Sequence, residues 1–430
     1  MKCEKRIILI VLLAVLATVP GTAWAGINVW TSRGPELASI GALAIDPQNP
    51  TTIYAGTWNS SGSGILKSTD GARSWSAASS VSAPNFVSAL SVDPQNSSTL
   101  YAATYYGVYK SIDGGTSWTA VNSELVGCWT LAVDPQNPST IYAGTGYGDV
   151  DVREIGVFKS TDGGKTWPYR ALSSSHGIYA LTMDPQNPTT LYAGTFEGVF
   201  KSTDGGMTWT TSNSGFTGGY VTAVAVDPKD PSTVYAGTYG SGVFKSTDGA
   251  RTWFRSALTS TTVRTLLVDP QTPSTVYAGT ERAGVFRSMD GGKSWSAENS
   301  GLTSTSVPAL ALDPKDPSTV YAGTFGGGVF DITFLSATSP VLALDSAKYC
   351  IGASWSLAVS NATPNSPIRL LGTSNGQPWE IAEWSKTDAN GSFSAKGTFP
   401  EGTEGSYTLR VEIGGVISNN VSFVVSNCKP

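Results

Sequence analysis

The sequence predicts an all-β chain, and three recurring features support that prediction. A Ser-x-Asp-Gly-small-x-x-Trp motif occurs six times, and an Asp-Pro turn followed by Tyr-Ala-Gly-Thr or a close variant marks seven repeats with a period of 41 to 50 residues. Periods of this length occur in β-propellers with four strands per blade. After the N-terminal apolar run, no useful length of sequence has helical periodicity. We therefore expect a seven-bladed β-propeller followed by a second all-β domain.

Residues 1–25 have the organisation of a secretory signal peptide. Lys2, Lys5 and Arg6 precede the apolar run Ile7–Val19, and Ala23-Trp24-Ala25 fits a small-x-small cleavage site. The run is too short to span a membrane comfortably, and no later segment is long and apolar enough to do so. We expect an exported monomer that is secreted, extracellular or held at the cell surface, with the periplasm as an alternative compartment.

Each repeat contains four short candidate strands, as the fifth repeat illustrates. Thr222–Val226 is β-branched and apolar, and an Asp-Pro turn separates it from Thr233–Ala236. Gly242–Lys245 is the third strand, and the Asp-Gly pair of the motif then turns the chain. We expect the Trp of the motif to begin the fourth strand, here within Thr252–Phe254.

The seventh repeat has no Ser-x-Asp motif, so its fourth strand must come from elsewhere. Trp30 stands 16 residues before Asp46, and the internal Trp-to-Asp spacings are 16 to 18. We therefore expect Ile27–Ser32 to supply the outer strand of the last blade. This pairing closes the ring, because it covers the last open sheet edge. The propeller then occupies residues 26–335.

Residues 336–430 lack the repeat landmarks and contain about seven short alternating stretches separated by turn signals. This pattern is typical of an immunoglobulin-like sandwich. An exported protein can form disulfides, and Cys350 and Cys428 bracket this domain, so we expect them to pair. Cys128 is then a small buried hydrophobe, with a reactive or intermolecular thiol as the alternative.

The six motif copies resemble the Asp-box, also called the bacterial neuraminidase repeat (BNR). This β-propeller superfamily includes sialidases, xyloglucan-cleaving glycoside hydrolases, sortilin-type receptors and photosystem II assembly factors. The resemblance covers residues 27 to about 335 and implies that the box lies on the blade edge away from the ligand face. It therefore implies a structural role for the motif aspartates, which are Asp70, Asp113, Asp162, Asp204, Asp248 and Asp290.

Composition excludes several classes of function. The net charge is −5 with no basic run, which gives no electrostatic footprint for nucleic acid. His176 is the only histidine, so a histidine-based metal site is excluded, and we expect neither a metal nor a cofactor. A calcium site made by Asp149, Asp151 and Glu154 is the alternative within the longest insertion.

A glycoside hydrolase remains a second hypothesis. Such an enzyme needs two carboxyl groups about 5–10 Å apart, and Glu197 and Glu281 are the candidates. The resemblance to xyloglucan-cleaving enzymes implies a cleft between two propellers, whereas this chain contains one. The resemblance to sialidases implies an arginine motif, and the nearest match, Arg33-Gly34-Pro35, lacks its hydrophobic residue.

Ligands of propellers are bound by the loops at one end of the channel. Aromatic residues follow the Tyr-Ala-Gly-Thr strand in five repeats, and further large residues stand just before the inner strands. We expect an exported, non-catalytic binding or scaffold protein for an extracellular glycan or protein. The alternatives are a glycoside hydrolase and an assembly factor for an envelope or membrane complex. The alternative for the aromatic residues is packing between blades. The candidate ligand-binding residues are Trp58, Tyr105, Trp129, Tyr179, Phe196, Tyr239, Arg264 and Arg282.

Overall fold

The computed structural model describes residues 29–58, 64–78, 86–123, 125–146, 155–172, 177–334, 341–360, 367–374, 377–387, 392–399, 403–413 and 416–427. Within these residues the secondary structure is all β, with no helix. The chain divides into two compact units, Asn28–Thr333 and a second unit that begins at Phe334. The expected signal peptide, residues 1–25, lies outside the described residues.

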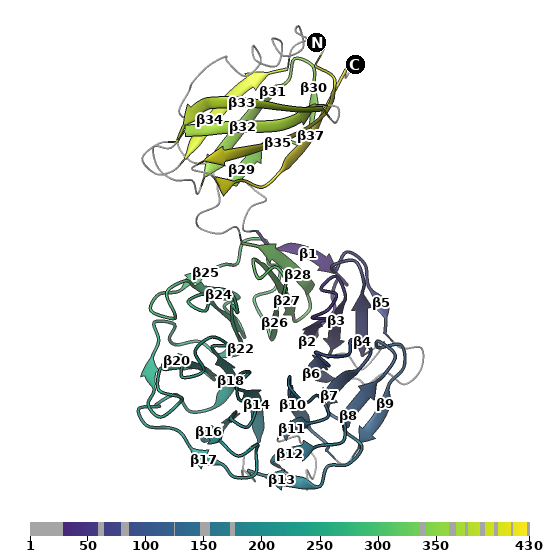
Figure 1. The fold of residues 1–430 in the computed structure, drawn as a ribbon, viewed down its shortest axis with the longest axis vertical. Helices are drawn as coiled ribbons and strands as arrows, with labels where there is room; N and C mark the ends of the chain where they lie inside the picture. The colour runs from purple at the N-terminus through teal and green to yellow at the C-terminus, as the bar shows by residue number, and fades with distance from the viewer. Residues whose placement is uncertain are drawn as a thin grey trace. The chain divides into compact units, whose positions relative to one another are not determined.

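The first unit consists of repeated four-stranded antiparallel sheets that resemble propeller blades, and seven such sheets occur in its described residues. We number the sheets one to seven in chain order. Figure 1 shows them arranged radially, with the first strand of each sheet toward the centre. The first strands are β2 (Ile40–Ile45), β6 (Val87–Val92), β10 (Cys128–Val133), β14 (Ile178–Met183), β18 (Val221–Val226), β22 (Val263–Val268) and β26 (Ala309–Leu312).

The second strands carry the Tyr-Ala-Gly-Thr sequence, or Tyr-Ala-Ala-Thr in the second sheet, and are buried along almost their whole length, because they lie between neighbours on both sides. They are β3 (Ile53–Thr57), β7 (Leu100–Thr104), β11 (Ile141–Thr145), β15 (Leu191–Thr195), β19 (Val234–Thr238), β23 (Val276–Thr280) and β27 (Thr319–Thr324). The third strands are β4 (Ile65–Ser68), β8 (Gly107–Ser111), β12 (Val157–Ser160), β16 (Gly198–Ser202), β20 (Gly242–Ser246), β24 (Val285–Ser288) and β28 (Gly328–Thr333).

The outer strands are short, and the prediction that the motif Trp begins them is wrong. Each Trp precedes its strand, because the motif carboxylate accepts a bond from the amide of the residue just before the Trp and so extends the loop. In the fifth sheet the outer strand is Phe254–Arg255 rather than Thr252–Phe254. The outer strands of sheets one to six are β5 (Ser76–Ala77), β9 (Thr119–Asn122), β13 (Tyr169–Ala171), β17 (Thr210–Thr211), β21 (Phe254–Arg255) and β25 (Ser296–Ala297).

The Ser-x-Asp motif forms a loop closed by its own side chains. In the first copy, the Asp70 carboxylate accepts a bond from the Ser74 hydroxyl at 2.6 Å and from the Ser74 amide at 2.9 Å. Ser68 donates to the same carboxylate at 2.8 Å and accepts from the Ala72 amide at 2.9 Å. These hydrogen bonds, chiefly from the Ser74 hydroxyl, lower the pKa of Asp70 to about 2. The carboxylate is thus engaged within its own loop.

The same loops hold neighbouring sheets together. Lys67 and Tyr54 of the first sheet both donate to the Gly114 carbonyl in the motif of the second sheet, at 2.7 and 3.0 Å. An equivalent lysine bonds the next motif at 2.7–2.9 Å across five successive interfaces. The motif therefore joins one sheet to the next as well as turning its own chain.

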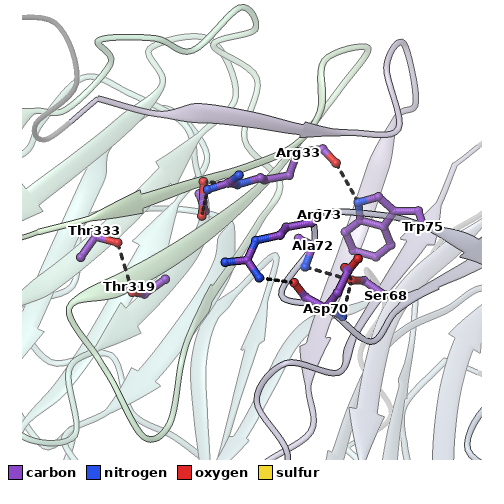
Figure 2. A network of polar contacts seen from close by, with 9 residues as sticks. Arg33, Ser68, Asp70, Ala72, Arg73, Trp75, Thr319 and Thr333 are labelled. Carbon is purple, nitrogen blue, oxygen red and sulfur yellow. Dashed lines mark hydrogen bonds and ion pairs between the residues drawn. The ribbon is translucent and has the colours of Figure 1, made fainter. Parts of the chain in front are cut away.

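The seventh sheet takes its outer strand from the N-terminal end of the first unit. β1 (Thr31–Gly34) pairs antiparallel with β28, and Thr31 stands opposite Asp331. The strand begins later than the expected Ile27–Ser32, since Val29 and Trp30 are not in a strand and residues 27–28 lie outside the described residues. Arg33 makes a bidentate ion pair with Asp331, with contacts of 2.7 and 2.9 Å. Figure 2 shows the Arg33 carbonyl accepting a bond from the Trp75 indole of the first sheet, 2.9 Å long.

The second unit is built from two sheets that share one core. Its strands are β29 (Val341–Leu344), β30 (Lys348–Cys350), β31 (Ser354–Ser360), β32 (Pro367–Ser374), β33 (Gln377–Lys386), β34 (Phe393–Thr398), β35 (Gly405–Ile413), β36 (Val416–Ile417) and β37 (Val421–Ser426). One sheet has the order β29-β31-β34, and the other has the order β30-β37-β35-β32-β33 with β36 paired to β35. Buried Trp355 in β31 and buried Val411 in β35, one from each sheet of this unit, belong to the same hydrophobic cluster. Cys428 lies outside the described residues, so its pairing with Cys350 stays a prediction.

Candidate functional site

One position in the first strands is turned out of the regular sheet pattern. In six sheets the pairing of the first and second strands shifts register at the second residue of the first strand. Such bulges re-aim a side chain and are frequent next to binding sites. We call these residues, with Pro308 of the seventh sheet, the bulge ring; they are Gly41, Ser88, Trp129, Tyr179, Thr222, Arg264 and Pro308. Trp129, Tyr179 and Arg264 thus lie within β10, β14 and β22, not before them as expected.

The bulge ring surrounds a cavity of about 240 Å³ that all seven first strands line. This cavity is the central channel of the first unit. In every sheet the residues on either side of the bulge are small or β-branched. The bulge residue itself differs between sheets, for example Gly41, Trp129 and Arg264. When one position varies while its neighbours keep the repeat pattern, a functional role is expected at that position.

A second set of positions lies at the same end of the channel. In six sheets the residue after the second strand donates a backbone bond to a residue shortly before its own first strand, as between the Trp58 amide and the Ser39 carbonyl at 2.9 Å. The same bond joins Tyr239 to Tyr220. We call this set the rim, and it contains Trp58, Tyr105, Gly146, Phe196, Tyr239, Glu281 and Phe325.

The rim and bulge-ring aromatics form a first cluster of rings around Trp58. The Trp58 ring centroid lies 5.7 Å from that of Trp129 and 5.4 Å from that of Phe325. The rings therefore pack on one another. This packing leaves a cavity beside the rings.

A second cluster lies on the fourth and fifth sheets. Tyr220, which the sequence interpretation did not single out, has its ring centroid 5.8 Å from Tyr239 and 6.4 Å from Tyr179. Phe196 contacts the same Tyr220 ring. Tyr239 is 55% exposed and Tyr220 is 39% exposed, so this cluster presents ring surface to solvent. Burial raises the pKa of Tyr179 above its ordinary value, and the nearby Tyr220 adds to the shift.

The charged candidates do not form a pair of carboxylates. Glu281 bonds Arg264 with a distance of 3.0 Å, so the acid and base expected as separate ligand groups neutralise each other. Glu197 follows the rim residue Phe196 in the fourth sheet, two sheets away from Glu281, and Arg282 is exposed. No carboxylate belongs to the described lining of the channel cavity or of the cavity beside Trp58.

A second cavity of about 350 Å³ lies beside the first aromatic cluster, between the first and third sheets. We call it the tryptophan pocket. The sequence interpretation identified three of its residues, Trp58, Tyr105 and Trp129, and missed the others. Of those others, Phe86 precedes β6 and Ser88 lies within it, Tyr106 lies in the short loop between β7 and β8, and Gly127 precedes β10, which Cys128 begins. For Tyr106 the only sequence signal was a second consecutive tyrosine. The pocket is lined by Trp58, Phe86, Ser88, Tyr105, Tyr106, Gly127, Cys128 and Trp129.

Cys128 forms part of the pocket wall as a free, buried thiol. Burial raises its pKa to about 12, which keeps it protonated at neutral pH. The described residues contain no cluster of three potential metal ligands. Asp149, Asp151, Glu154 and His176 lie outside the described residues. The described residues form no helix that is long and apolar enough to cross a membrane.

Comparisons with known proteins place the fold. The sequence matches no protein-family model and no curated protein. An ancestral GH74 enzyme is similar in structure, with a TM-score of 0.58 and 17% identity over 92% of this chain. The similar region spans 63% of that enzyme, which is less than two thirds of its length. The GH74 enzyme of Niastella koreensis has a TM-score of 0.52 and 18% identity, covering 93% of this chain and 75% of that one.

YCF48, in a structure with a D1 peptide bound, is also similar. Its TM-score is 0.54 with 15% identity, and the match covers 74% of this chain and 100% of YCF48. These identities are low, so the likenesses speak for the fold alone. The chain shares the β-propeller fold of GH74 and YCF48 proteins.

Proposed function

We propose that this protein is an exported, non-catalytic binding protein. Its first unit is a seven-bladed Asp-box propeller closed by the N-terminal strand, and it presents one end of its channel to a carbohydrate or protein ligand. The second unit is an immunoglobulin-like sandwich that serves as a spacer, a partner-binding module or an attachment. The Tyr407 hydroxyl bond to the Thr403 carbonyl, 2.6 Å long, supports this assignment, since it resembles the tyrosine corner of such sandwiches.

The observation that carries the proposal is the gathering of aromatic rings at one end of the channel. Two clusters come from rim and bulge-ring positions of several sheets, joined in the second by Tyr220, and they flank the channel cavity. Large aromatic side chains on rigid elements bind sugars and peptides with little loss of conformational entropy. A non-catalytic role is supported by the lack of carboxylates in the described lining of either cavity.

The likeness to GH74 enzymes keeps glycoside hydrolysis as the second candidate, with Glu197 and Glu281 as its acids. The ion pair between Glu281 and Arg264 argues against that role, because it engages the Glu281 carboxylate with a side chain of the protein itself. The YCF48 likeness supports the third candidate, an assembly factor, which is itself a form of protein binding.

An array of glycans, polysaccharides and peptides, incubated with the mature chain, tests the proposal when it is read for binding and for released sugar. Binding without release that weakens in Trp58→Ala and persists in Glu281→Gln is the expected result. Sugar release that disappears in Glu197→Gln or Glu281→Gln would establish a hydrolase instead. Circular dichroism of each variant shows whether the fold is kept.

A further inference from the structure

The tryptophan pocket depends on an exchange of glycine and tryptophan between two sheets. In the first sheet, the bulge residue is Gly41 and the rim residue is Trp58. In the third sheet, the bulge residue is Trp129 and the rim residue is Gly146. A Cβ atom at Gly41 would lie 2.2 Å from the Trp58 indole nitrogen, and one at Gly146 would lie 2.3 Å from Trp129 Cδ1. Each tryptophan therefore occupies the space that the glycine of its own sheet leaves open.

The sheet between them leaves room for the two indoles to meet. Its bulge residue is Ser88, whose hydroxyl donates to the Cys128 carbonyl at 2.6 Å. This short side chain stays close to the backbone, so Trp58 and Trp129 approach each other with their ring centroids 5.7 Å apart. The pocket opens beside them, bounded on the second sheet by Tyr105 and Tyr106.

The two pocket tryptophans differ from the other tryptophans of the first unit in their hydrogen bonding. The seven others that the structure describes each donate their indole N–H to an acceptor. The indole nitrogens of Trp58 and Trp129 are buried and find no acceptor among the described residues. A buried donor without a partner is destabilising. The two residues are thus placed at the expense of stability, which is the pattern expected of a binding site.

The lining determines what the pocket can accept. Its described side chains carry no charge, and the Ser88 hydroxyl already donates within the protein. The two unpaired indole N–H groups are buried against the glycines of their own sheets, so they offer no donor to a ligand in the pocket. A buried sugar would therefore leave several hydroxyls without partners, at a cost in free energy. An uncharged apolar side chain incurs no such cost. The volume of about 350 Å³ is at the lower end of the range for ligand sites, which suits one large side chain.

We infer that the tryptophan pocket binds an aromatic or bulky aliphatic side chain of an extended segment in a protein partner. Tyr106, half exposed at the pocket edge, and the Trp58–Trp129 pair supply the aromatic contacts that concentrate binding energy at protein interfaces. The inference rests on the proposed binding function and names the ligand class and the place where it binds.

The test uses the mature chain and capped peptides acetyl-Ser-Gly-X-Gly-Ser-amide, in which X is Phe, Leu or Ala, with cellohexaose as the sugar probe. Affinities are measured by calorimetry, and the indole N–H signals are followed by NMR. We expect the Phe and Leu peptides to bind at least tenfold more tightly than the Ala peptide and to shift the signals of Trp58 and Trp129. Trp58→Ala should weaken binding about 10- to 30-fold.

Tyr106→Ala is the second variant, because a ring that is half exposed can be removed without unfolding the sheet. This change should weaken binding of the Phe peptide several-fold. Tyr239→Ala reports on binding at the second cluster. Tyr169→Ala is the matched control, because Tyr169 is a half-exposed ring in the outer strand β13, and it should leave peptide affinity unchanged.

Loss of peptide binding in Tyr239→Ala alone would overturn the inference and leave the proposed function intact. Binding of cellohexaose that shifts the Trp58 signal would replace the side-chain ligand by a sugar, again without affecting the proposed function. Failure of every peptide here, together with a silent glycan and peptide array, would overturn both.

Discussion

The ion pair between Arg33 and Asp331 should contribute measurably to closing the ring of sheets. It joins residues 298 positions apart, and Asp331 is only 9% exposed. Arg33 retains 32% side-chain exposure, so solvent screening reduces the contribution. A hydrogen bond to a charged group contributes about 1.5–3 kcal/mol, and we place this bidentate pair near 2 kcal/mol.

The two single variants should differ in a definite direction. Arg33→Ala leaves a carboxylate buried without its cation, whereas Asp331→Ala leaves an arginine that can turn toward water. We therefore expect Arg33→Ala to lower the free energy of unfolding by about 2–3 kcal/mol and Asp331→Ala by about 1 kcal/mol less. Arg251→Ala, which removes an exposed arginine from a motif loop, should change it by less than about 0.5 kcal/mol.

The assay is urea unfolding followed by tryptophan fluorescence, with refolding checked for each variant. The double variant should be less damaging than the sum of the single changes, with a coupling free energy of about 1–2 kcal/mol. Hydrogen exchange at Thr31 and Ser32 reports whether β1 itself is released. A coupling below about 0.3 kcal/mol, or a larger loss in Asp331→Ala than in Arg33→Ala, would refute this account. Trp30, buried and bonded to the Glu298 carbonyl, would then be the main anchor of the N-terminal strand.

Three further predictions concern pH, backbone conformation and the thiol. Loop hydrogen bonds lower the pKa of Asp113 from 3.8 to about 2, and burial raises that of Tyr101 from 10.0 to about 12. The urea midpoint should therefore fall as the pH drops from about 4 to 2, and again as it rises from 10 to 12; a midpoint constant across either window would contradict this. Gly242→Ala should cost more than about 2 kcal/mol in urea unfolding, because its Cβ would lie 2.0 Å from a carbonyl oxygen at a φ of +82°. Gly240→Ala, with similar φ and open space, should cost about 1 kcal/mol, and equal losses would exclude the clash. Cys128 should react with Ellman's reagent only after unfolding, and rapid reaction of the native chain would show that the pocket opens.

The repeated sheets could be predicted because their signals are local and occur many times. An Asp-Gly turn, an apolar alternating strand and a Trp at a set distance each specify a few neighbouring residues, and every copy reinforces the rest. The pairing of β1 with β28 could also be predicted. The seventh repeat lacks the motif that precedes an outer strand, and Trp30 stands where that motif's Trp would be expected before the first repeat. The outer strands begin one or two residues after the Trp rather than at it, because the Asp carboxylate extends the loop by bonding the residue before Trp.

The tryptophan pocket could not be predicted by the same reasoning. Trp58 and Trp129 were recognised as large residues at channel positions, but their meeting depends on Gly41, Gly146 and Ser88, and small residues leave no distinctive pattern in a chain with 48 glycines. Their small size acquires meaning only when the sheets are placed in order around the channel, with the second sheet between the first and third. A repeat fold makes this comparison possible within one sequence, because each position occurs once per sheet. In the first sheet the bulge position holds Gly41 and the rim position holds Trp58, whereas in the third sheet the bulge position holds Trp129 and the rim position holds Gly146. The equivalent positions of the other sheets lack this exchange, which is the signal for the pocket.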